Sequence, residues 1–223
     1  AFLSAYNARA FGVKDYIAQL MFNSPPGLSD AMDLAKMLTV LDMIESLERD
    51  DFKIWKQTRI GLLSHPLDPD AARGHLAAST YLQMALKPHI YHIVGHTEAH
   101  HAATAEDVIE ASKIARRAIE NAMGAPDMTA DPAIKKRRKK LSTEANAILD
   151  AIRSLAGSDV GDPFTDAATL ARAVTSGILD APQLVNNKFG RGQVKTRIVN
   201  GACVSVDGNG KPISEARRLE ALT

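Results

Sequence analysis

The chain has 223 residues, a formal net charge of +1 and 24% charged residues, which is the composition of an ordinary globular protein. This balance gives no reason to expect nucleic acid or a membrane as a partner, and no apolar stretch approaches the roughly 18 residues of a membrane-spanning helix. The single cysteine, Cys203, excludes an internal disulfide and fits a cytoplasmic location.

Three strand-then-helix units are predicted in the first half of the chain. Ser29, Asp68 and Thr104 are each well placed to cap the helix of one unit, and the helices have apolar residues at intervals of three and four. The units comprise, in chain order, a strand at 16–22 and the helix after Ser29, a strand at 53–63 and a helix at 68–86, and a strand at 90–94 and a helix at 104–123.

The pattern changes after Gly124, and the rest of the chain is typical of an α+β tail. Asn200-Gly201 joins two alternating stretches and predicts a tight β-hairpin. The predicted elements of the tail are a helix at 141–155, a short helix at 166–176 and a hairpin at 193–206. We therefore expect two domains, a partial barrel at 1–124 and a tail at 125–223.

Six consecutive cations at 135–140 precede the first helix of the tail. They have no interleaved aromatic residue, and a helix would spread them around its axis. A nucleic-acid contact and a solvated helix start both remain open, and the second is favoured.

Three parallel strands are too few to close a barrel and few for an open sheet of this type. We expect an α/β fold, a partial TIM-type (β/α) barrel of about three βα units with an α+β tail containing a β-hairpin. The missing strands would then come from the remainder of the barrel or from a homo-oligomer.

The stretch at 92–102 holds four of the seven histidines of the chain around one carboxylate, Glu98. It follows the third predicted strand, at the end where parallel α/β folds place their ligands. On an extended backbone alternate residues face the same way, so His96, Glu98 and His100 would converge. A metal-free active-site cluster is favoured over a two-histidine, one-carboxylate metal site and over a solvated loop.

Polar residues also stand at the ends of the first two predicted strands. Arg59, beside Thr58, suits the carboxylate or phosphate of a substrate, and equally an ion pair between loops. Asn23 could hydrogen-bond a ligand, although Asn-Ser-Pro-Pro-Gly is also simply good turn chemistry.

Two features of the chain match a known family. Glu98-Ala99 follows the third strand and Thr104 opens the next helix. In the tail, a helix, a Gly-Ser-Asp loop and a short helix lead to Gly177-Ile178-Leu179-Asp180-Ala181-Pro182. In this order and register, the third unit and the tail resemble the C-terminal half of the large catalytic subunit of adenosylcobalamin-dependent glutamate mutase (methylaspartate mutase).

The resemblance implies a TIM-type barrel whose mouth faces cobalamin. In that family, homolysis of the cobalt–carbon bond gives a radical that abstracts a substrate hydrogen and permits a carbon-skeleton rearrangement. Glu98 matches a family glutamate near the adenosyl group. The cobalamin-ligating pattern Asp-x-His-x-x-Gly is absent. His92 and Gly95 have its spacing, but Ile90 stands at the position of the Asp. The cofactor must therefore be carried by a small cobalamin-binding partner subunit.

We therefore expect an isomerase component that acts on a small acid or amino acid. The candidate catalytic residues are Glu98, His96 and His100, the candidate cofactor contacts are Glu98 and Asn23, and the candidate substrate contacts are Arg59 and Thr58, with no metal. A metal-dependent hydrolase or lyase using His96, Glu98 and His100 is the alternative, and a non-catalytic scaffold fragment is the third possibility.

Overall fold

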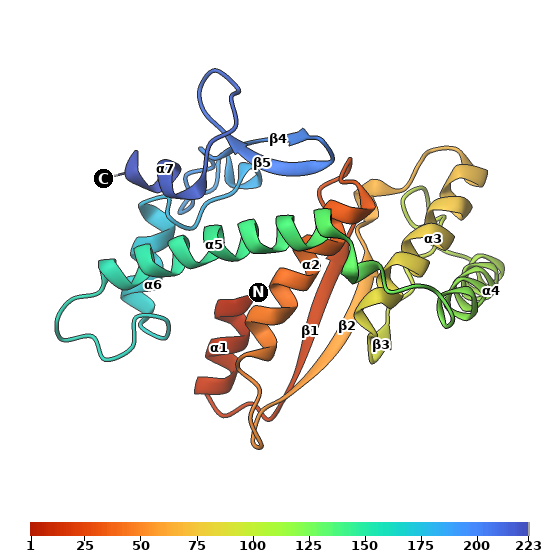
Figure 1. The fold of residues 1–223 in the computed structure, drawn as a ribbon, viewed down its shortest axis with the longest axis horizontal. Coiled ribbons are helices and arrows are strands. Elements are labelled where there is room, and N and C mark those ends of the chain that lie inside the picture. Colours follow the sequence, from red (N-terminus) through yellow and green to blue (C-terminus); the bar gives the residue numbers. More distant parts are fainter. Residues whose placement is uncertain (223) are drawn as a thin grey trace.

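The computed structural model describes residues 1–222, and its centre is a three-stranded parallel sheet (Figure 1). Its strands are β1 (Asp15–Phe22), β2 (Lys53–Ile60) and β3 (Ile90–Tyr91), and they lie side by side in chain order. β1 and β2 pair along their whole length, whereas β3 pairs only at Gln57↔Ile90 and Thr58↔Tyr91. The predicted α/β class is confirmed, and no closed barrel forms within residues 1–222.

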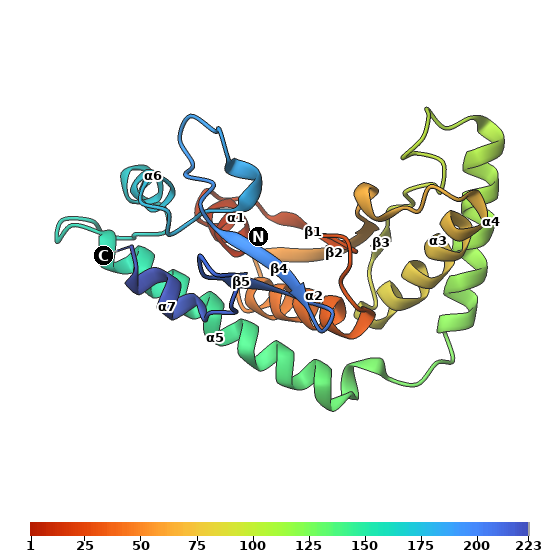
Figure 2. The ribbon, with the colours of Figure 1, turned by 90° about the horizontal axis from the view of Figure 1, so that it is seen from above.

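The two helices that connect the strands, α2 (Asp30–Glu45) and α3 (Pro69–Gln83), cover one face of this sheet (Figure 2). The helix after the last strand, α4 (Ala105–Ala122), packs against α3. Because side chains alternate along a strand, Leu20 and Phe22 point under the helices and are buried. Ile17 and Trp55, which pair across β1 and β2, point to the opposite face and are exposed.

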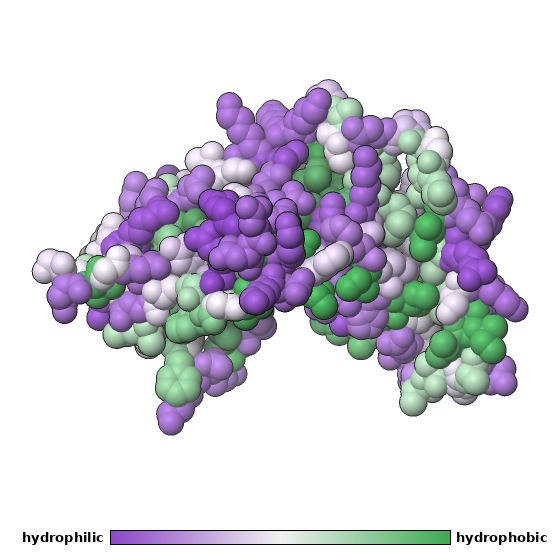
Figure 3. Space-filling model, turned by 90° about the horizontal axis from the view of Figure 1, so that it is seen from below, coloured by the Kyte–Doolittle hydropathy of each residue, from purple (hydrophilic) through white to green (hydrophobic). Residues whose placement is uncertain are grey.

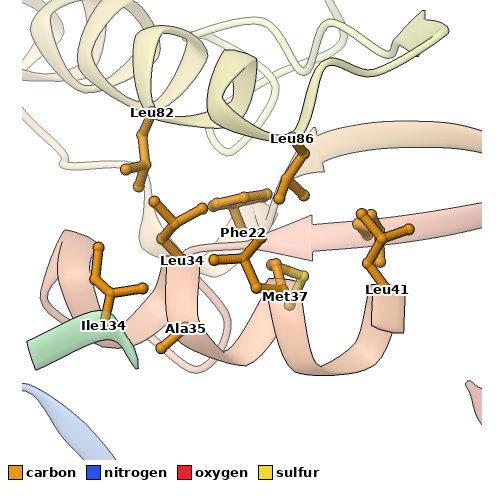
Figure 4. Packing of buried hydrophobic residues seen from close by; sticks show 10 residues of the cluster. Phe22, Leu34, Ala35, Met37, Leu41, Leu82, Leu86 and Ile134 are labelled. Atoms are coloured by element: carbon orange, nitrogen blue, oxygen red, sulfur yellow. The ribbon is translucent and has the colours of Figure 1, made fainter. Parts of the chain in front are cut away.

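The predicted helix caps explain where these helices begin. Ser29 accepts a hydrogen bond from the amide of Met32, and Asp68 accepts one from Ala71. Thr104 and Asp107 form the predicted capping box. The main apolar core then lies between β1, α2 and α3 (Figure 4), and comprises Leu20, Phe22, Leu34, Ala35, Met37, Leu38, Leu41, Leu82, Leu86 and Ile134.

The tail packs against the first units. Ile134, on the tail helix α5 (Pro132–Leu155), belongs to the core just described. A second cluster joins Ile152 and Phe164 to Phe2 and Tyr6 of α1 (Phe2–Ala10). The remaining tail elements are two 3-10 turns (Met128–Ala130 and Pro182–Leu184), α6 (Ala167–Thr175), β4 (Lys195–Val199), β5 (Ala202–Val206) and α7 (Glu215–Glu220). Apolar contacts therefore cross the predicted boundary at residue 124, which itself stays a prediction.

Two predicted strands are shorter in the structure. β2 ends at Ile60, and a 3-10 turn (Leu62–Ser64) replaces its expected last residues. β3 has two residues rather than the predicted 90–94, because its last ladder bond runs from the amide of His92 to the carbonyl of Thr58. Within the described residues β3 has a neighbour on one side only, so nothing holds 93–94 extended.

The first tail helix begins nine residues earlier than predicted. Asp131 caps it and Pro132 occupies its first position, a combination that favours a helix start. The basic run at 135–140 therefore lies inside the helix, where Arg138 pairs with Asp42 of α2. The hairpin is confirmed, since Asn200 and Gly201 both have positive φ, as a type I′ turn requires.

Candidate functional site

The loops that follow the strands gather at one end of the sheet. The loop after β3 touches the loop after β2, because the Nε2 atom of His100 lies 3.3 Å from the carbonyl oxygen of Pro66. The loop after β1 is tied to α3, since the hydroxyl of Ser79 donates to Oδ1 of Asn23 at 2.5 Å. The polar residues predicted at separate strand ends therefore belong to one region.

Residues 95–101 form turns rather than an extended segment, which corrects the predicted convergence of His96, Glu98 and His100. The amide of Glu98 donates to the carbonyl of Gly95, and the amide of His100 donates to that of Thr97. His96 consequently points inward and is 2% exposed, whereas Glu98 and His100 are exposed. The alternation fails because the chain has left the sheet after Tyr91.

Glu98 is anchored by its own loop. Its Oε1 atom accepts a hydrogen bond from the amide of Gly95 at 2.6 Å. The side chain borders a pocket of about 130 Å³ between this loop and the first turns of α4, with Thr97 and Asp107 among the other lining residues. Within residues 1–222 the second carboxylate oxygen makes no hydrogen bond, so it can accept one from a ligand hydroxyl.

His96 lies beneath this loop, against an ion pair between two helices. Its Nε2 atom is 3.5 Å from Oε2 of Glu110 on α4, and Arg73 on α3 donates to Oε1 of Glu110 at 2.6 Å. The hydrogen bond from Arg73 holds the pKa of Glu110 below its usual value, so this carboxylate is ionised at neutral pH. A separation of 3.5 Å is long for an N–H···O bond, and neither ring nitrogen of His96 has a hydrogen-bond partner within residues 1–222.

Two further histidines, His65 and His75, lie in the same region and were missed from the sequence. His65 is 8% exposed, and neither of its ring nitrogens has a hydrogen-bond partner within the described residues. Its ring meets that of His75 edge to face at 5.4 Å, and Ser64 Oγ lies 3.0 Å from Nε2 of His75. No local motif marks these residues, because 31 positions separate His65 from His96.

Acidification should destabilise the protein through the buried ring of His65 and the half-buried ring of His75. Burial lowers the pKa of His65 and the ring of His75 lowers it further, while Glu98 opposes the shift. Burial also lowers the pKa of His75. The histidines of the unfolded chain therefore bind protons at a higher pH than those of the folded chain. The free energy of unfolding is then highest above the usual histidine pKa of 6.5 and decreases as the pH falls below it. Denaturant melts between about pH 7.5 and pH 5.5 should show a falling midpoint.

The variant His65→Phe removes one titrating ring while keeping the buried site apolar. Its midpoint should fall less steeply with acidification than that of the wild type. His92→Asn, at an exposed position, is the matched control and should keep the wild-type slope. An unchanged slope in His65→Phe would show that the buried ring does not titrate between the two states.

Thr58 and Arg59 do not share a site, because neighbouring strand residues point to opposite faces. Thr58 is fully buried under the helices, and its hydroxyl has no hydrogen-bond partner within residues 1–222. Arg59 pairs in register with Met21 on the face without helices and is partly exposed. Only Arg59 of this predicted pair can reach a ligand on the uncovered face.

Asn23 belongs to a buried polar network. Its backbone has a positive φ of 56°, and its amide donates to Oδ2 of Asp33. Its Oδ1 accepts from Ser79, whose hydroxyl in turn accepts from Gln83 Nε2 at 3.0 Å. Asn23 therefore uses its side-chain oxygen within the protein, and its position fixes the turn after β1.

A larger pocket of about 620 Å³ lies at the other end of the sheet, where Lys56 and Leu86 border it between the ends of α2, α3 and α4. Parallel α/β proteins place their ligands at the carboxyl ends of the strands, so we assign the candidate site to the smaller pocket beside Glu98.

Comparisons with known proteins give no assignment: no protein-family model matches the chain, and no curated protein matches it significantly. In residues 1–222, no three His, Cys, Asp or Glu side chains come together in an arrangement that could hold a metal ion. The same part of the chain contains no helix with the length and apolar character needed to cross a membrane.

Proposed function

We propose that the chain is a component of an adenosylcobalamin-dependent carbon-skeleton isomerase that acts in the cytoplasm on a small acid or amino acid. The observation that carries the proposal is Glu98, a carboxylate in the loop after β3 with one oxygen fixed and the other open to a ligand. It occupies the position that the family resemblance gives to a glutamate beside the adenosyl group.

The sheet would be part of a (β/α) barrel. Its strands follow one another in chain order, and the two helices that connect them lie on one face only. Doubly wound sheets carry helices on both faces, whereas successive units of a barrel carry them all outside. The uncovered face with Gln19, Gln57 and Arg59 would then line the barrel interior.

Exposed apolar side chains and open strand edges support the proposal that further strands or another chain pack against this sheet. Within residues 1–222, β1 and β3 each pair on one side only. Apolar side chains gather over α4 at the right of the space-filling view (Figure 3), where Val108 and Ile109 are exposed. Either the remainder of the barrel or further copies of the chain would cover them.

The residues around Glu98 fit part of an adenosyl group. A carboxylate with one free oxygen is a suitable acceptor for ribose hydroxyls. The adjoining pocket of about 130 Å³ is smaller than the roughly 300–1,000 Å³ of most small-molecule sites. A partner that carries the cofactor would therefore have to cover the open side of the pocket beside Glu98.

Each candidate site residue then has a role in the proposed reaction. Glu98 orients the ribose, and Arg59 is placed to bind a substrate carboxylate from the uncovered face. His96 and His100 support the loop that holds Glu98. The cofactor itself, when bound, supplies the radical chemistry that starts the rearrangement.

Tritium transfer tests this function. The full chain would be mixed with the small cobalamin-binding subunit of a methylaspartate mutase and adenosylcobalamin tritiated at the 5′ carbon. A panel of small acids, including glutamate, would be offered as substrate. We expect tritium in one of these acids only when the chain is present. No transfer to any acid by a complex that does form would contradict the proposed chemistry.

The metal-dependent alternative has no favouring observation, since His96 points inward while Glu98 and His100 are exposed, and the described residues hold no group of three ligands that could bind a metal ion. We therefore propose no second function.

A further inference from the structure

The loop between β2 and α3, residues 61–68, buries a histidine and exposes its leucines. Leu63 and Leu67 are 87% and 86% exposed, whereas His65, between them, is 8% exposed. The opposite arrangement would be more stable, because burial is favourable for an apolar side chain and costly for a polar one without hydrogen bonds. The inward position of His65 is therefore not explained by packing.

The ring of His65 has exchanged water for neighbours that do not replace its hydrogen bonds. Both ring nitrogens lack a partner among the described residues. The ring of His75 on α3 meets it edge to face, and the hydroxyl of Ser64 contacts His75 rather than His65. A buried polar group without a partner calls for an explanation, and a role in switching is one.

His65 is also the side chain that attaches this loop to its surroundings. Among the side chains of residues 61–68, it is the one that is buried. The next residue, Pro66, meets the loop after β3 through its carbonyl oxygen, which lies 3.3 Å from Nε2 of His100. Movement of His65 out of its place would therefore free the loop from α3 and from the loop that carries Glu98.

Titratable groups from two elements face the ring of His65. α3 contributes His75, and the loop after β3 contributes His96, His100 and the carboxylate Glu98. A positive charge on His65 is therefore opposed by burial and by imidazoles that can themselves become cationic, whereas Glu98 favours it.

Further charges act on these neighbours rather than on His65. Glu110 of α4 lies 3.5 Å from Nε2 of His96 and is already bound by Arg73. Burial lowers the pKa of His75, and Asp30 at the start of α2 opposes that shift. These contacts leave the ring of His65 without a counter-ion in direct contact within residues 1–222.

We propose that His65 is a pH-sensitive switch, which releases loop 61–68 from α3 and from the loop after β3 when its ring binds a proton. The cationic ring needs water or hydrogen-bond acceptors, which the buried position does not supply, so the ring moves into solvent and the loop moves with it. The release itself does not depend on the proposed function. Its consequence, weaker binding of a ligand at Glu98 in acid, rests on that function.

The direction of the switch follows from the surroundings of the ring. Burial lowers the pKa of His65 and the ring of His75 lowers it further, while Glu98 opposes the shift. In the released loop the ring is solvated and has its usual pKa of 6.5, so it binds the proton at a higher pH than in the closed loop. The closed loop is therefore favoured most above pH 6.5 and progressively less below it.

Amide hydrogen exchange of the full chain, measured residue by residue by NMR, tests the switch. The amides of residues 64 and 65 donate to the carbonyls of Gly61 and Leu62, so the closed loop protects them. Their protection, relative to an unstructured peptide at the same pH, should fall several-fold between about pH 7.5 and pH 5.5. The limit for one such proton is about tenfold. The amide of Ser29, which donates to Gly201, is the internal control and should keep its protection.

Three variants identify the group that titrates. His65→Phe cannot bind a proton, so the protection of residues 64 and 65 should be the same at both pH values. Glu98→Gln removes the anion that favours the cationic ring, so its loop should open at a lower pH than that of the wild type. His92→Asn, at an exposed position, is the matched control and should follow the wild type.

Each result supports or overturns the switch. Protection in the wild type that stays within about twofold between the two pH values would overturn it. An equal fall in His65→Phe would also overturn it, because another group would then open the loop. Should His65→Phe fail to fold, an opening pH in Glu98→Gln that is unchanged or higher would be decisive against it. A parallel fall at Ser29 would show that acid unfolds the whole chain instead. None of these results affects tritium transfer, so the proposed function is tested separately.

Discussion

Replacing Lys36 with methionine should lower the free energy of unfolding by about 3 kcal/mol. The carboxylate of Asp33 is fully buried, and the ammonium of Lys36 lies 2.6 Å from its Oδ1 atom. Methionine keeps the apolar stem but leaves Asp33 ionised in the interior without a counter-ion. Removing one partner of a buried ion pair costs about 3–5 kcal/mol. The partial exposure of Lys36 places this pair at the lower end of that range. Equilibrium urea denaturation would measure the loss.

The size of this loss should depend on pH. Burial raises the pKa of Asp33 above its usual value, and Lys36 opposes that rise. A raised folded-state pKa means that ionisation of Asp33 costs stability, which is recovered as the pH falls through that pKa. Without Lys36 the pKa should rise further. We therefore expect Lys36→Met to lose less stability relative to the wild type at about pH 5 than at about pH 8.

Two further variants separate burial from charge. In Asp33→Asn/Lys36→Met the asparagine oxygen can still accept the amide of Asn23, and no charge is left buried, so this double variant should be more stable than Lys36→Met. Lys140→Met is the control, since its partner Glu144 lies 3.7 Å away on the surface. Exposed pairs of this kind contribute about 0.3–0.5 kcal/mol. Equal losses in Lys36→Met and Lys140→Met would show that Asp33 does not need a counter-ion.

Local signals in the sequence were sufficient for most of the fold. Ser29, Asp68 and Thr104 were predicted as caps because the side chain that satisfies a helix amide lies within a few residues of it. The hairpin followed from Asn200-Gly201 for the same reason, since its turn geometry is a property of two residues. Neither signal depends on the rest of the chain.

The errors arose where a distant partner decides the local structure. The last part of the predicted third strand is not part of the sheet, because no neighbouring strand pairs with it beyond Tyr91. The basic run at 135–140 lies inside α5 rather than before it, because Arg138 has a partner, Asp42, contributed by α2. The local signals for the start of α5 are Asp131, which caps it, and Pro132 at its first position.

The candidate site was predictable in position but not in geometry. Polar residues after parallel strands point to one end of a sheet, and the loops do meet there. The inward position of His96 could not be predicted, because the turn at 95–101 replaces the extended backbone on which the alternation rests. Asn23 was interpreted as a ligand contact or a turn residue, whereas its partner Ser79 lies 56 positions away.

Replacing Glu98 with alanine should produce the largest functional effect. The loss of turnover should exceed the loss in Glu98→Gln, for which we expect a decrease on the order of 10- to 100-fold. Glutamine keeps an oxygen that can accept the amide of Gly95 but no longer presents a carboxylate to the ligand. Alanine removes both contacts and leaves the hydroxyls of the ligand without a partner. Turnover and tritium transfer by the reconstituted complex would measure both variants.

Stability should hardly change in either variant, which distinguishes a ligand-binding role from a structural one. Glu98 is exposed, so its one internal hydrogen bond, which the amide of Gly95 donates, should lie at or below the low end of the about 1.5–3 kcal/mol that hydrogen bonds to charged groups contribute. Glu106, an exposed carboxylate in the first turn of α4, is the matched control, and Glu106→Ala should retain wild-type turnover. If Glu98→Ala turned over like the wild type, or if it melted far below Glu98→Gln, Glu98 would be a loop-holding residue. The reacting groups would then have to be sought on the uncovered face around Arg59.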